Sequence, residues 1–576
     1  MSAASKTKTR TATHRPATRH RRFRHDDLIA VDLFSGFGGL TRGIEMAGFT
    51  TIMAANHNSY KVEVHEANHP NAEHWIADLV DPEAADYHSA RDLPAADLLV
   101  AGVSCVNHSQ ANTIKAYEQG LTLFGMEDPD FEERVTKSER DRATANCVLH
   151  YAAQNRPRLI LVECTTELTS WGPAVPGRKK VGDGSTYRWW LKQFDLLDYR
   201  HKVLYLNSQF FGVPQSRNRG YWIFWDKSLP EPDLEHRPVS RCHGCDKDVE
   251  AVWTWRTGIP PTGSVSYGKQ YDYRCPHCRR EVVPPMMPSL AALDLSNLGI
   301  RIGDKPIKTF KDGFVGPLAQ SSMERAERCR QRFAEFPAVL MPAKGVHGSE
   351  RLLLQPMATQ TSQQETAILS TGPVVEPLWP QPAGQTMAPA ALAVANYQGA
   401  PRGAHEPLPT QVGSETLAVV SSGVIPYRKN TVPTVHGEAM PTFTSEQIPG
   451  LLTAVGWYKQ NGSTGNETAP HPLTDPLGTL TSRDTTALLM AQWRATLAEL
   501  PLEDCFYRMM AAHEIGRGCG FDVDFRDYRG TFTVWGTARN QVDGFGNAVS
   551  PQVGAWIGSR LRAVIHAQDH DLTTAA

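Results

Sequence analysis

The sequence contains no apolar run near the roughly 18–20 residues that a membrane-spanning helix requires. Its first 25 residues also lack the apolar core of a secretory signal peptide. Cysteine is scarce, with 10 residues among 576, and these are too dispersed for a disulfide scaffold. The absences exclude a membrane helix and a disulfide-dense secreted domain, and they favour a protein of the reducing cytoplasm.

Charge of one sign is also not in excess, since the formal net charge is only −2. Any nucleic-acid surface must therefore be local. The most basic segment is residues 1–26, which hold eight Lys and Arg residues and no acid before Asp26. We interpret it as a disordered tail, with contact to a DNA backbone as the alternative. With 41% hydrophobic and 21% charged residues, the remaining length predicts two or three folded domains.

A glycine-rich turn follows the first predicted strand. The apolar run at 28–31 leads into Asp-Leu-Phe-Ser-Gly-Phe-Gly-Gly-Leu at 32–40, and a helix is predicted at 41–47. Glycines at such a turn let a ligand approach the backbone and the amides of the helix N-terminus. Many nucleotide-binding folds use a turn of this kind. The wording of this one resembles the first signature block of the DNA (cytosine-5) methyltransferases, whose methyl donor is S-adenosylmethionine (SAM).

Further positions of the donor pocket are implied by this resemblance. The predicted strand at 51–55 ends at Asn56, where the family usually has an acid for the ribose hydroxyls, and Asp78 follows a third strand. In the family an aspartate at the latter position accepts a hydrogen bond from the adenine amino group. The expected donor-binding residues are Phe34, Ser35, Gly36, Gly38, Gly39, Asn56, Asp78, Leu79, Asn547 and Val549.

A cysteine follows the next strand. Residues 97–110 read Asp-Leu-Leu-Val-Ala-Gly-Val-Ser-Cys-Val-Asn-His-Ser-Gln, which resembles the family's nucleophile block. Addition of a thiolate to carbon 6 of cytosine makes carbon 5 nucleophilic enough to accept a methyl group. The resemblance therefore implies that Cys105 is the nucleophile, although Ser104 stands where the family has proline.

Two later blocks supply charged side chains. The strand at 158–162 ends in Glu163-Cys164, where the family has Glu-Asn, and that glutamate acts on ring nitrogen 3 and the amino group of cytosine. The segment Gly-Val-Pro-Gln-Ser-Arg-Asn-Arg at 212–219 resembles another family block. By resemblance Arg219 faces the cytosine carbonyl oxygen and Arg217 supports the site. The predicted catalytic residues are Cys105, Glu163, Arg217 and Arg219.

The final blocks lie more than three hundred residues further along the chain. Gly-Asn-Ala-Val-Ser-Pro at 546–551 resembles the family element that folds back beside the donor pocket. Residues 507–521 resemble the block before it, in which Arg508 is expected to organise the DNA-reading region.

The long segment between these blocks carries two Cys-x2-Cys pairs. This spacing is typical of a zinc ribbon in which four thiolates complete a tetrahedral site. Because no open coordination position is implied, we expect a structural zinc ion held by Cys242, Cys245, Cys275 and Cys278.

A loose repeat rich in proline, threonine and glycine occupies residues 350–490. Copies begin at 356, 407, 440 and 476, and they predict stacked hairpins. Packing alone could explain such hairpins. The alternative is contact with DNA, for which Arg428, Lys429, Lys459 and Arg483 are candidate phosphate or base-edge residues.

Together these features predict an α/β fold: a doubly wound, Rossmann-like SAM-dependent methyltransferase domain with a smaller, mostly-β target-recognition domain that contains the zinc ribbon. The expected divisions are a basic tail at 1–26, the first catalytic part at 27–225, the recognition region at 226–500 with its ribbon at about 240–282, the last catalytic blocks at 501–566 and a disordered tail at 567–576.

The expected function is methyl transfer from SAM to carbon 5 of a flipped-out cytosine in double-stranded DNA through a covalent bond to Cys105. We expect a monomer in a bacterial or phage-encoded, nucleoid-associated setting, without a membrane partner. No cognate restriction enzyme can be inferred. Two alternatives stay open. One is a DNA-binding protein of this fold with weakened catalysis, suggested by Ser104, Asn56 and Cys164. The other is an RNA cytosine-5 methyltransferase.

Overall fold

The computed structural model describes most of both ends of the chain. The described ranges are 27–81, 83–103, 144–172, 183–258, 263–294, 297–310, 312–334, 338–343, 350–353, 355–371, 497, 500–524 and 529–575, together with short strands between 375 and 492. The basic tail, Cys105 and the repeat copies at 407, 440 and 476 therefore lie outside the described residues. Among the helices that are described, none is both long and apolar enough to cross a membrane.

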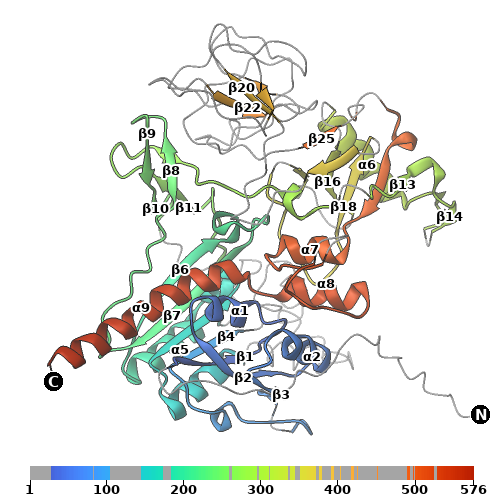
Figure 1. Cartoon of the computed structure of the whole chain (residues 1–576). Helices are drawn as coiled ribbons and strands as arrows, with labels where there is room; N and C mark the ends of the chain where they lie inside the picture. The colour runs from blue at the N-terminus through green and yellow to red at the C-terminus, as the bar shows by residue number, and fades with distance from the viewer. Residues whose placement is uncertain are drawn as a thin grey trace, which may run out of the picture.

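A seven-stranded sheet forms the centre of the larger domain (Figure 1). Its strand order is β3-β2-β1-β4-β5-β7-β6, and β7 is antiparallel to both of its neighbours while the other pairs are parallel. The strands are β1 (Ile29–Leu33), β2 (Thr50–Asn56), β3 (Glu73–Ile76), β4 (Leu98–Gly102), β5 (Leu159–Cys164), β6 (Tyr199–Asn207) and β7 (Asn218–Asp226). This parallel-dominated sheet confirms the predicted α/β class.

Alternate residues of the buried strands face opposite layers, as the two-residue period of a strand requires. One layer packs against the helical residues 144–155 and α5 (Ser185–Leu196). The other packs against α1 (Gly39–Met46) and α9 (Pro551–Ala575). α2 (Ser59–Asn68) follows β2 and contacts β2 and β3. The domain thus has helices on both faces of its sheet.

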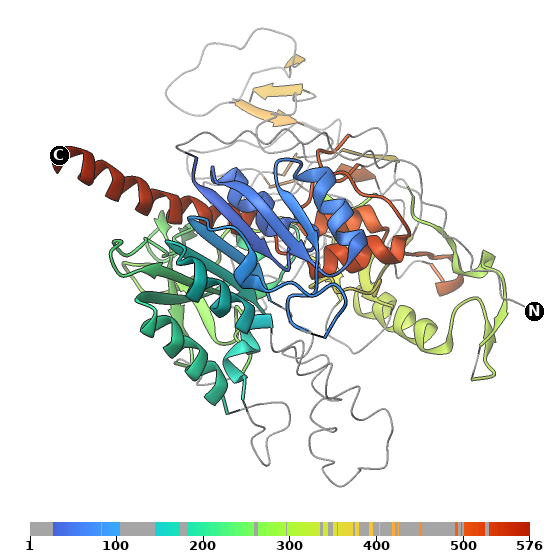
Figure 2. The same cartoon turned by 90° about the horizontal axis from the view of Figure 1, so that it is seen from below.

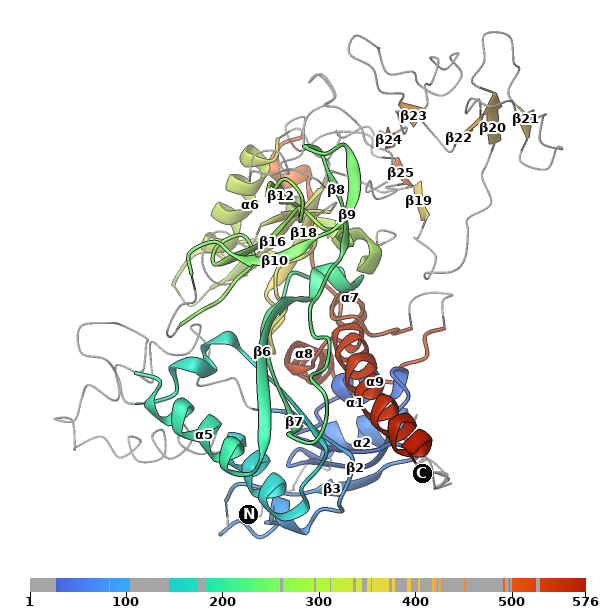
Figure 3. The same ribbon diagram turned by 90° about the vertical axis from the view of Figure 1, so that its left-hand side faces the viewer.

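The last helix returns from the far end of the chain to lie beside the first, as Figures 1 and 3 both show. Glycine permits this approach, because a Cβ added to Gly43 would lie 2.6 Å from the carbonyl oxygen of Pro551. Figure 2 shows from below how α9 then continues outward to the C-terminus. The helix runs to Ala575, because no glycine or proline interrupts 559–575.

A second, five-stranded sheet lies at one end of the first (Figure 3). Its strand order is β13-β26-β18-β16-β17. α6 (Gln320–Arg332) covers one face through Ala326 and Cys329. The strand that carries Arg508 belongs to this sheet. The members are β13 (Ile300–Arg301), β16 (Ala338–Pro342), β17 (Arg351–Leu352), β18 (Thr366–Ser370) and β26 (Phe506–Met509).

The four-cysteine segment forms two small antiparallel units beside β6. One is the hairpin of β8 (Val239–Cys242) and β9 (Lys247–Glu250). The other is the sheet of β10 (Val252–Trp255), β11 (Tyr271–Arg274) and β12 (Glu281–Val282). We call residues 239–282 the ribbon.

The remaining elements are short connectors and two helices near the last signature block. They are η1 (Ala90–Asp92), η2 (Thr166–Ser170), η3 (Ser208–Phe211), η4 (Ser289–Ala292), η5 (Ile302–Asp304), η7 (Leu502–Asp504), α7 (Ala512–Gly518), α8 (Ala538–Asn547), β14 (Lys308–Thr309), β15 (Val315–Gly316), β19 (Val375–Leu378), β20 (Ala391–Val394), β21 (Arg402–Gly403), β22 (Leu417–Val420), β23 (Val424–Ile425), β24 (Gly450–Leu451) and β25 (Met490–Gln492).

Candidate active site

The glycine-rich turn lies between β1 and α1, at the point where the strand order of the large sheet reverses. Ligands of open α/β sheets bind at this point, beyond the carboxyl ends of the strands. Phe34, Gly36 and Gly38 all have positive φ, at 59°, 55° and 79°. At Gly38 a Cβ would lie 2.6 Å from the imidazole Nε2 of His69, so a side chain there would collide with α2 and its cap. The turn is therefore fixed by close packing on its inner side.

No described residue fills the outer side of the same turn. Among the described residues, a Cβ on Gly36 would meet the carbonyl oxygen of Phe34, at 3.9 Å, and a Cβ on Gly102 would meet that oxygen at 3.7 Å. The buried hydroxyl of Ser35 and one carboxylate oxygen of Asp32 find no hydrogen-bond partner among the described residues. Open space next to unsatisfied buried polar atoms is what a polar ligand pocket requires.

Asp32 is buried at the end of β1, and desolvation raises the pKa of its carboxyl from 3.8 to about 7, although the Thr41 hydroxyl that donates to it opposes the rise. The Thr41 oxygen also lies 3.0 Å from Nε2 of His65, which in turn contacts His74. Burial first, and then the neighbouring histidines His69 and His74, keep the pKa of His65 well below its ordinary value. Asp32 lies within the glycine-rich motif but was not among the site residues predicted from the sequence.

Asn56 and Asp78 lie next to each other at the ends of β2 and β3, because the amide of Ala77 donates to the carbonyl of Asn56 at 3.1 Å. The side-chain oxygen of Asn56 accepts from the Asn58 amide at 3.0 Å. Asp78 Oδ1 accepts from the amides of Val80 and Asp81 at 2.9 and 3.1 Å. Both polar side chains therefore order the turns that follow their strands. Leu79 is buried beside them.

The last signature block packs directly on the first. A Cβ on Gly39 would lie 2.0 Å from the carbonyl oxygen of Val549, so this contact depends on glycine. Val549 is buried, whereas Asn547 is exposed and donates to Asp543 at 3.1 Å. The tertiary structure thus brings residues 39 and 549 together.

Glu163 and Arg219 form an ion pair at the carboxyl end of the sheet. Glu163 Oε1 lies 3.1 Å from Arg219 Nε, and the side chains are only 6% and 13% exposed. The guanidinium also donates to the carbonyl of Asn218 at 2.8 Å. Glu163 pairs in register with Gly102 of β4, and its carbonyl accepts from the amide of Val103 at 3.2 Å. The chain segment that leads to Cys105 therefore leaves the sheet beside this ion pair.

Arg217 occupies a different place from Arg219, although only one residue separates them. It is buried, and its Nη1 donates to the carbonyl of Gly546 at 2.9 Å and to that of Gln360 at 3.4 Å. Its backbone amide donates to Asn207 at 3.1 Å. Arg217 therefore ties the 212–219 segment to the last signature block.

Residues 28–124 match the family model of the C-5 cytosine-specific DNA methylases. Over these residues the chain is similar to this family.

Several curated methylases are similar to this chain over part of its length. The type II methyltransferase M.NgoBI of Neisseria gonorrhoeae is 26% identical over 226 residues, which cover 38% of this chain and 59% of that protein. The DNA-cytosine methyltransferase of Escherichia coli K12 is 32% identical over 103 residues, or 16% of this chain and 22% of that protein. The chain therefore spans less than two thirds of the relatives it matches. Among solved structures, the Entamoeba histolytica methyltransferase EhMeth covers 93% of this chain and 98% of its own at 12% identity, with a TM-score of 0.33, too low to carry an inference.

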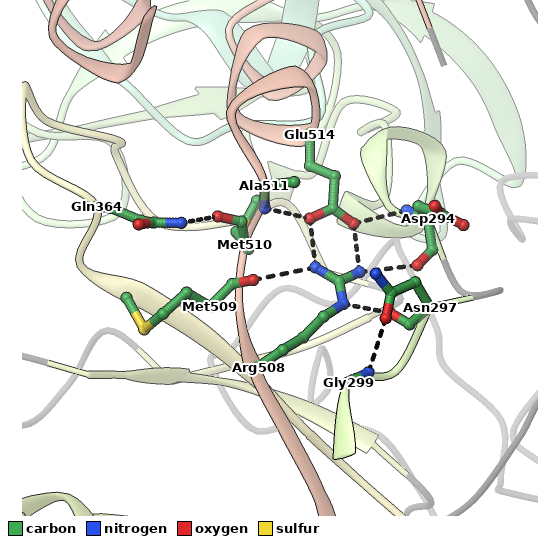
Figure 4. Close-up of polar contacts among 9 residues, drawn as sticks. All are labelled: Asp294, Asn297, Gly299, Gln364, Arg508, Met509, Met510, Ala511 and Glu514. Atoms are coloured by element: carbon green, nitrogen blue, oxygen red, sulfur yellow. Dashed lines mark hydrogen bonds and ion pairs between the residues drawn. The ribbon is translucent and has the colours of Figure 1, made fainter. Parts of the chain in front are cut away.

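The Arg508 guanidinium forms a closed polar hub with Glu514 of α7 (Figure 4). Both nitrogen–oxygen distances are 2.6 Å, and Glu514 is fully buried. The carboxylate also accepts from the amides of Asp294 and Ala511 at 2.6 Å each. Arg508 donates in addition to the carbonyls of Asp294, Met509 and Asn297. The hub joins β26, α7 and the 294–299 loop, so Arg508 does organise this part of the chain.

The four predicted metal ligands also come together. Their sulfur atoms all lie within 4.8 Å of one another, with 3.4 Å between Cys242 and Cys278 and 3.8 Å between Cys245 and Cys275. Four thiolates around a tetrahedral zinc ion, at bond lengths of about 2.3 Å, have their sulfurs about 3.8 Å apart. This cluster could hold one metal ion.

Proposed function

We propose that this protein transfers the methyl group of SAM to carbon 5 of a cytosine in double-stranded DNA. The observation that carries the proposal is the buried ion pair of Glu163 and Arg219 beside the point where β4 leads toward Cys105. Addition to a cytosine ring requires a thiol together with a carboxyl and a guanidinium such as those that meet at this sheet edge.

In the proposed reaction the Cys105 thiolate adds to carbon 6 of the base. Glu163 hydrogen-bonds ring nitrogen 3 and the amino group, which draws electrons from carbon 6. Arg219 faces the carbonyl oxygen, where negative charge develops as the thiolate adds. Carbon 5 then attacks the methyl group of SAM, whose sulfur–methyl bond breaks to release S-adenosylhomocysteine. Carbon 5 next gives its proton to a solvent base, and the bond between carbon 6 and the Cys105 sulfur breaks to release the thiolate. Arg217 holds the segment in place through Gly546.

The donor would occupy the open side of the glycine-rich turn. SAM supplies a methyl group on a positively charged sulfur, which is a strong electrophile. The unsatisfied Ser35 hydroxyl and the open space above Gly36 fit a bound polar molecule. The remaining candidates for this pocket are Phe34, Gly38, Gly39, Asn56, Asp78, Leu79, Asn547 and Val549.

Duplex DNA is the proposed partner, with the target cytosine flipped out of the stack, because carbon 6 cannot be reached inside a helix. The four ribbon cysteines would hold a structural zinc ion, supported by their sulfur–sulfur distances. Relatives named type II methyltransferases suggest a restriction-modification setting.

Replacement of Cys105 by alanine tests the proposal. We expect loss of tritiated methyl incorporation into duplex DNA and of the denaturation-resistant adduct with DNA that carries 5-fluorocytosine at the target, while SAM binding is retained. Cys505→Ala, which removes a thiol from the five-stranded sheet region, is the matched control. Unchanged incorporation by Cys105→Ala would refute the assigned role.

Bisulfite sequencing of DNA from a methylation-free host that expresses the wild-type chain separates the alternatives. New 5-methylcytosine in DNA supports the proposed activity. Its absence, together with retained duplex binding, would indicate the weakened DNA-binding protein. Methylation of tRNA without methylation of duplex DNA would indicate the RNA enzyme.

A further inference from the structure

We infer that the ribbon clamps the two chain segments that carry Glu163 and Arg219, so that its metal site controls the methyl-transfer step more than affinity for DNA. This inference rests on the proposed function and assigns the ribbon a positioning role in it.

The first contact joins the ribbon to η2, the 3-10 turn that begins three residues after Glu163. The ribbon loop before β11 directs three successive groups at this turn. Two of them are backbone amides, so the contact depends on the path of the loop and on the acceptors that η2 provides. The contacts are Gly263 N to Ser170 Oγ at 2.8 Å, Val265 N to Thr166 Oγ1 at 2.9 Å, and Ser264 Oγ to Glu167 Oε1.

The second contact reaches the residue before Arg219. The amide of Tyr267 donates to Asn218 Oδ1 at 3.0 Å. The same oxygen accepts from Asn207 Nδ2 at 3.0 Å, and the Asn218 carbonyl accepts from the Arg219 guanidinium. Asn218 therefore connects the ribbon loop to the backbone and side chain of Arg219. One five-residue loop thus contacts both of the chain segments that carry Glu163 and Arg219.

The third contact is apolar and includes the metal ligands. Phe210 of η3 is buried in the same cluster as Cys242 and Cys275. Its ring centroid lies 4.7 Å from that of Tyr267 and 5.3 Å from that of Tyr273. The core of the ribbon is therefore continuous with the segment that leads into Arg217 and Arg219.

The ribbon is too small to keep this shape without help. Its sheets contain strands of only two to four residues, and such small units usually depend on a metal or a disulfide. A bound metal supplies folding energy to a unit of this kind. Loss of the metal should release the 263–267 loop and, with it, the supports of Glu163 and Arg219.

Small displacements of catalytic groups slow a reaction without weakening substrate binding, since a shift of about 1 Å can cost about 10²-fold in rate. A ribbon that only reads DNA would behave in the opposite way. Its loss would weaken duplex affinity and leave the rate at saturating duplex unchanged.

Hydrogen–deuterium exchange of the full chain, with and without a zinc chelator, tests the clamp without requiring turnover. We expect faster exchange not only in the ribbon but also at the amides of Leu168 and Trp171 in and after η2, and in peptides covering 207–219. Exchange that accelerates in the ribbon while these segments stay protected would overturn the inference.

Replacing one hydroxyl by a methyl group tests the same contact with the metal in place. Thr166→Val removes the acceptor for the Val265 amide, and Thr254→Val is its matched control, because the Thr254 hydroxyl bonds only to Val252 within β10 among the described contacts. We expect Thr166→Val to lower the single-turnover methylation rate about tenfold at saturating duplex, with duplex Kd within about twofold of wild type. Thr254→Val should match wild type.

An unchanged rate in Thr166→Val, or a loss of duplex affinity larger than the loss of rate, would overturn the clamp while leaving the proposed function intact. Failure of the wild-type chain to methylate any cytosine would remove the proposed function, and the exchange experiment would still decide whether the ribbon supports η2 and 207–219.

Discussion

Two buried carboxylates, Glu514 and Asp32, differ in how many hydrogen bonds they accept. Glu514 of α7 is fully buried and accepts hydrogen bonds from two guanidinium nitrogens and two backbone amides. One oxygen of Asp32, at the end of β1, accepts a hydrogen bond from the Thr41 hydroxyl. The other oxygen has no partner among the described residues. Burial therefore raises the pKa of Asp32 to about 7. A buried polar group without partners is costly, so it usually marks a place where something else binds.

The difference distinguishes a buried polar cluster whose hydrogen bonds are all made within the protein from a site that leaves room for a ligand. The hub around Arg508 is closed, and its polar atoms serve to fix β26, α7 and the 294–299 loop. In the turn after β1, His69 packs closely against Gly38, whereas the only described atom near a Cβ built on Gly36 is the carbonyl oxygen of Phe34. Structural regions satisfy their own polar atoms, whereas a ligand pocket leaves some of them for the ligand.

The largest effect is expected from breaking the closed hub. Glu514→Gln leaves the Arg508 charge buried without a carboxylate, which should lower the free energy of unfolding by about 3–5 kcal/mol. Urea unfolding measures it. The double variant Arg508→Met/Glu514→Gln should recover part of this loss, because no unpaired charge remains. Equal stability of Glu514→Gln and wild type would contradict the importance of the hub.

The burial of Asp32 should make the free energy of unfolding depend on pH. The folded pKa of Asp32, about 7, lies above its ordinary value of 3.8, so the folded state retains a proton that the unfolded chain loses. Its contribution to stability is complete below about pH 4 and disappears as pH rises through about 7. At 1.36 kcal/mol per unit of pKa, the loss is at most about 4 kcal/mol.

Comparison with Asp32→Asn isolates this effect, since the asparagine does not titrate and the contribution of His65 is common to both proteins. The difference in unfolding free energy between the two should change between about pH 4 and pH 7 and remain constant above. A difference that is independent of pH would show that Asp32 titrates normally.

The proposed role of the Glu163–Arg219 ion pair can be tested directly. Glu163→Gln keeps the shape of the side chain but removes its charge and its proton. We expect methyl transfer at saturating duplex to fall about 10²-fold, equivalent to about 2.7 kcal/mol in the barrier, with SAM binding unchanged. Glu250→Gln, at an exposed position of the ribbon, is the matched control. A loss below about threefold would remove Glu163 from the reaction.

The smallest effect is expected at the contact between the two chain ends. A Cβ at Gly43 would lie 2.6 Å from the Pro551 oxygen and 2.8 Å from the Ala555 nitrogen, both backbone atoms that cannot rotate away. We expect Gly43→Ala to cost about 1–2 kcal/mol of unfolding free energy. Met46→Ala on the same helix, at a side chain 60% exposed, should be nearly neutral in the same unfolding assay.

Local patterns allowed much of the catalytic half to be predicted. Apolar runs before Phe34, Asn56 and Glu163 became buried parallel strands, because such runs fit a sheet covered on both faces. The Cys-x2-Cys pairs likewise predicted a cluster, since four thiols at that spacing have few other uses. The role of Cys105 itself stays a prediction, because it lies outside the described residues.

The contacts between distant segments could not be predicted in the same way. Nothing in the local sequence shows that Tyr267 donates to Asn218, or that Arg217 reaches Gly546 while Arg219 reaches Glu163. From the local sequence alone, Arg217 and Arg219 are not distinguishable, because they are the same residue type in one extended segment. The packing around each side chain decides that Arg217 bonds to the Gly546 carbonyl and that Arg219 pairs with Glu163.

The sequence by itself determined the order of the strands along the chain, the glycine-rich turn and the residue types available for chemistry, because these follow from short-range periodicity and backbone sterics. The tertiary structure alone decided that residues 39 and 549 would touch, that one Asp32 oxygen would have no partner among the described residues, and that the four-cysteine ribbon would contact η2 and Asn218. Burial and hydrogen bonding between segments hundreds of residues apart depend on how the whole chain packs, and no local pattern encodes them.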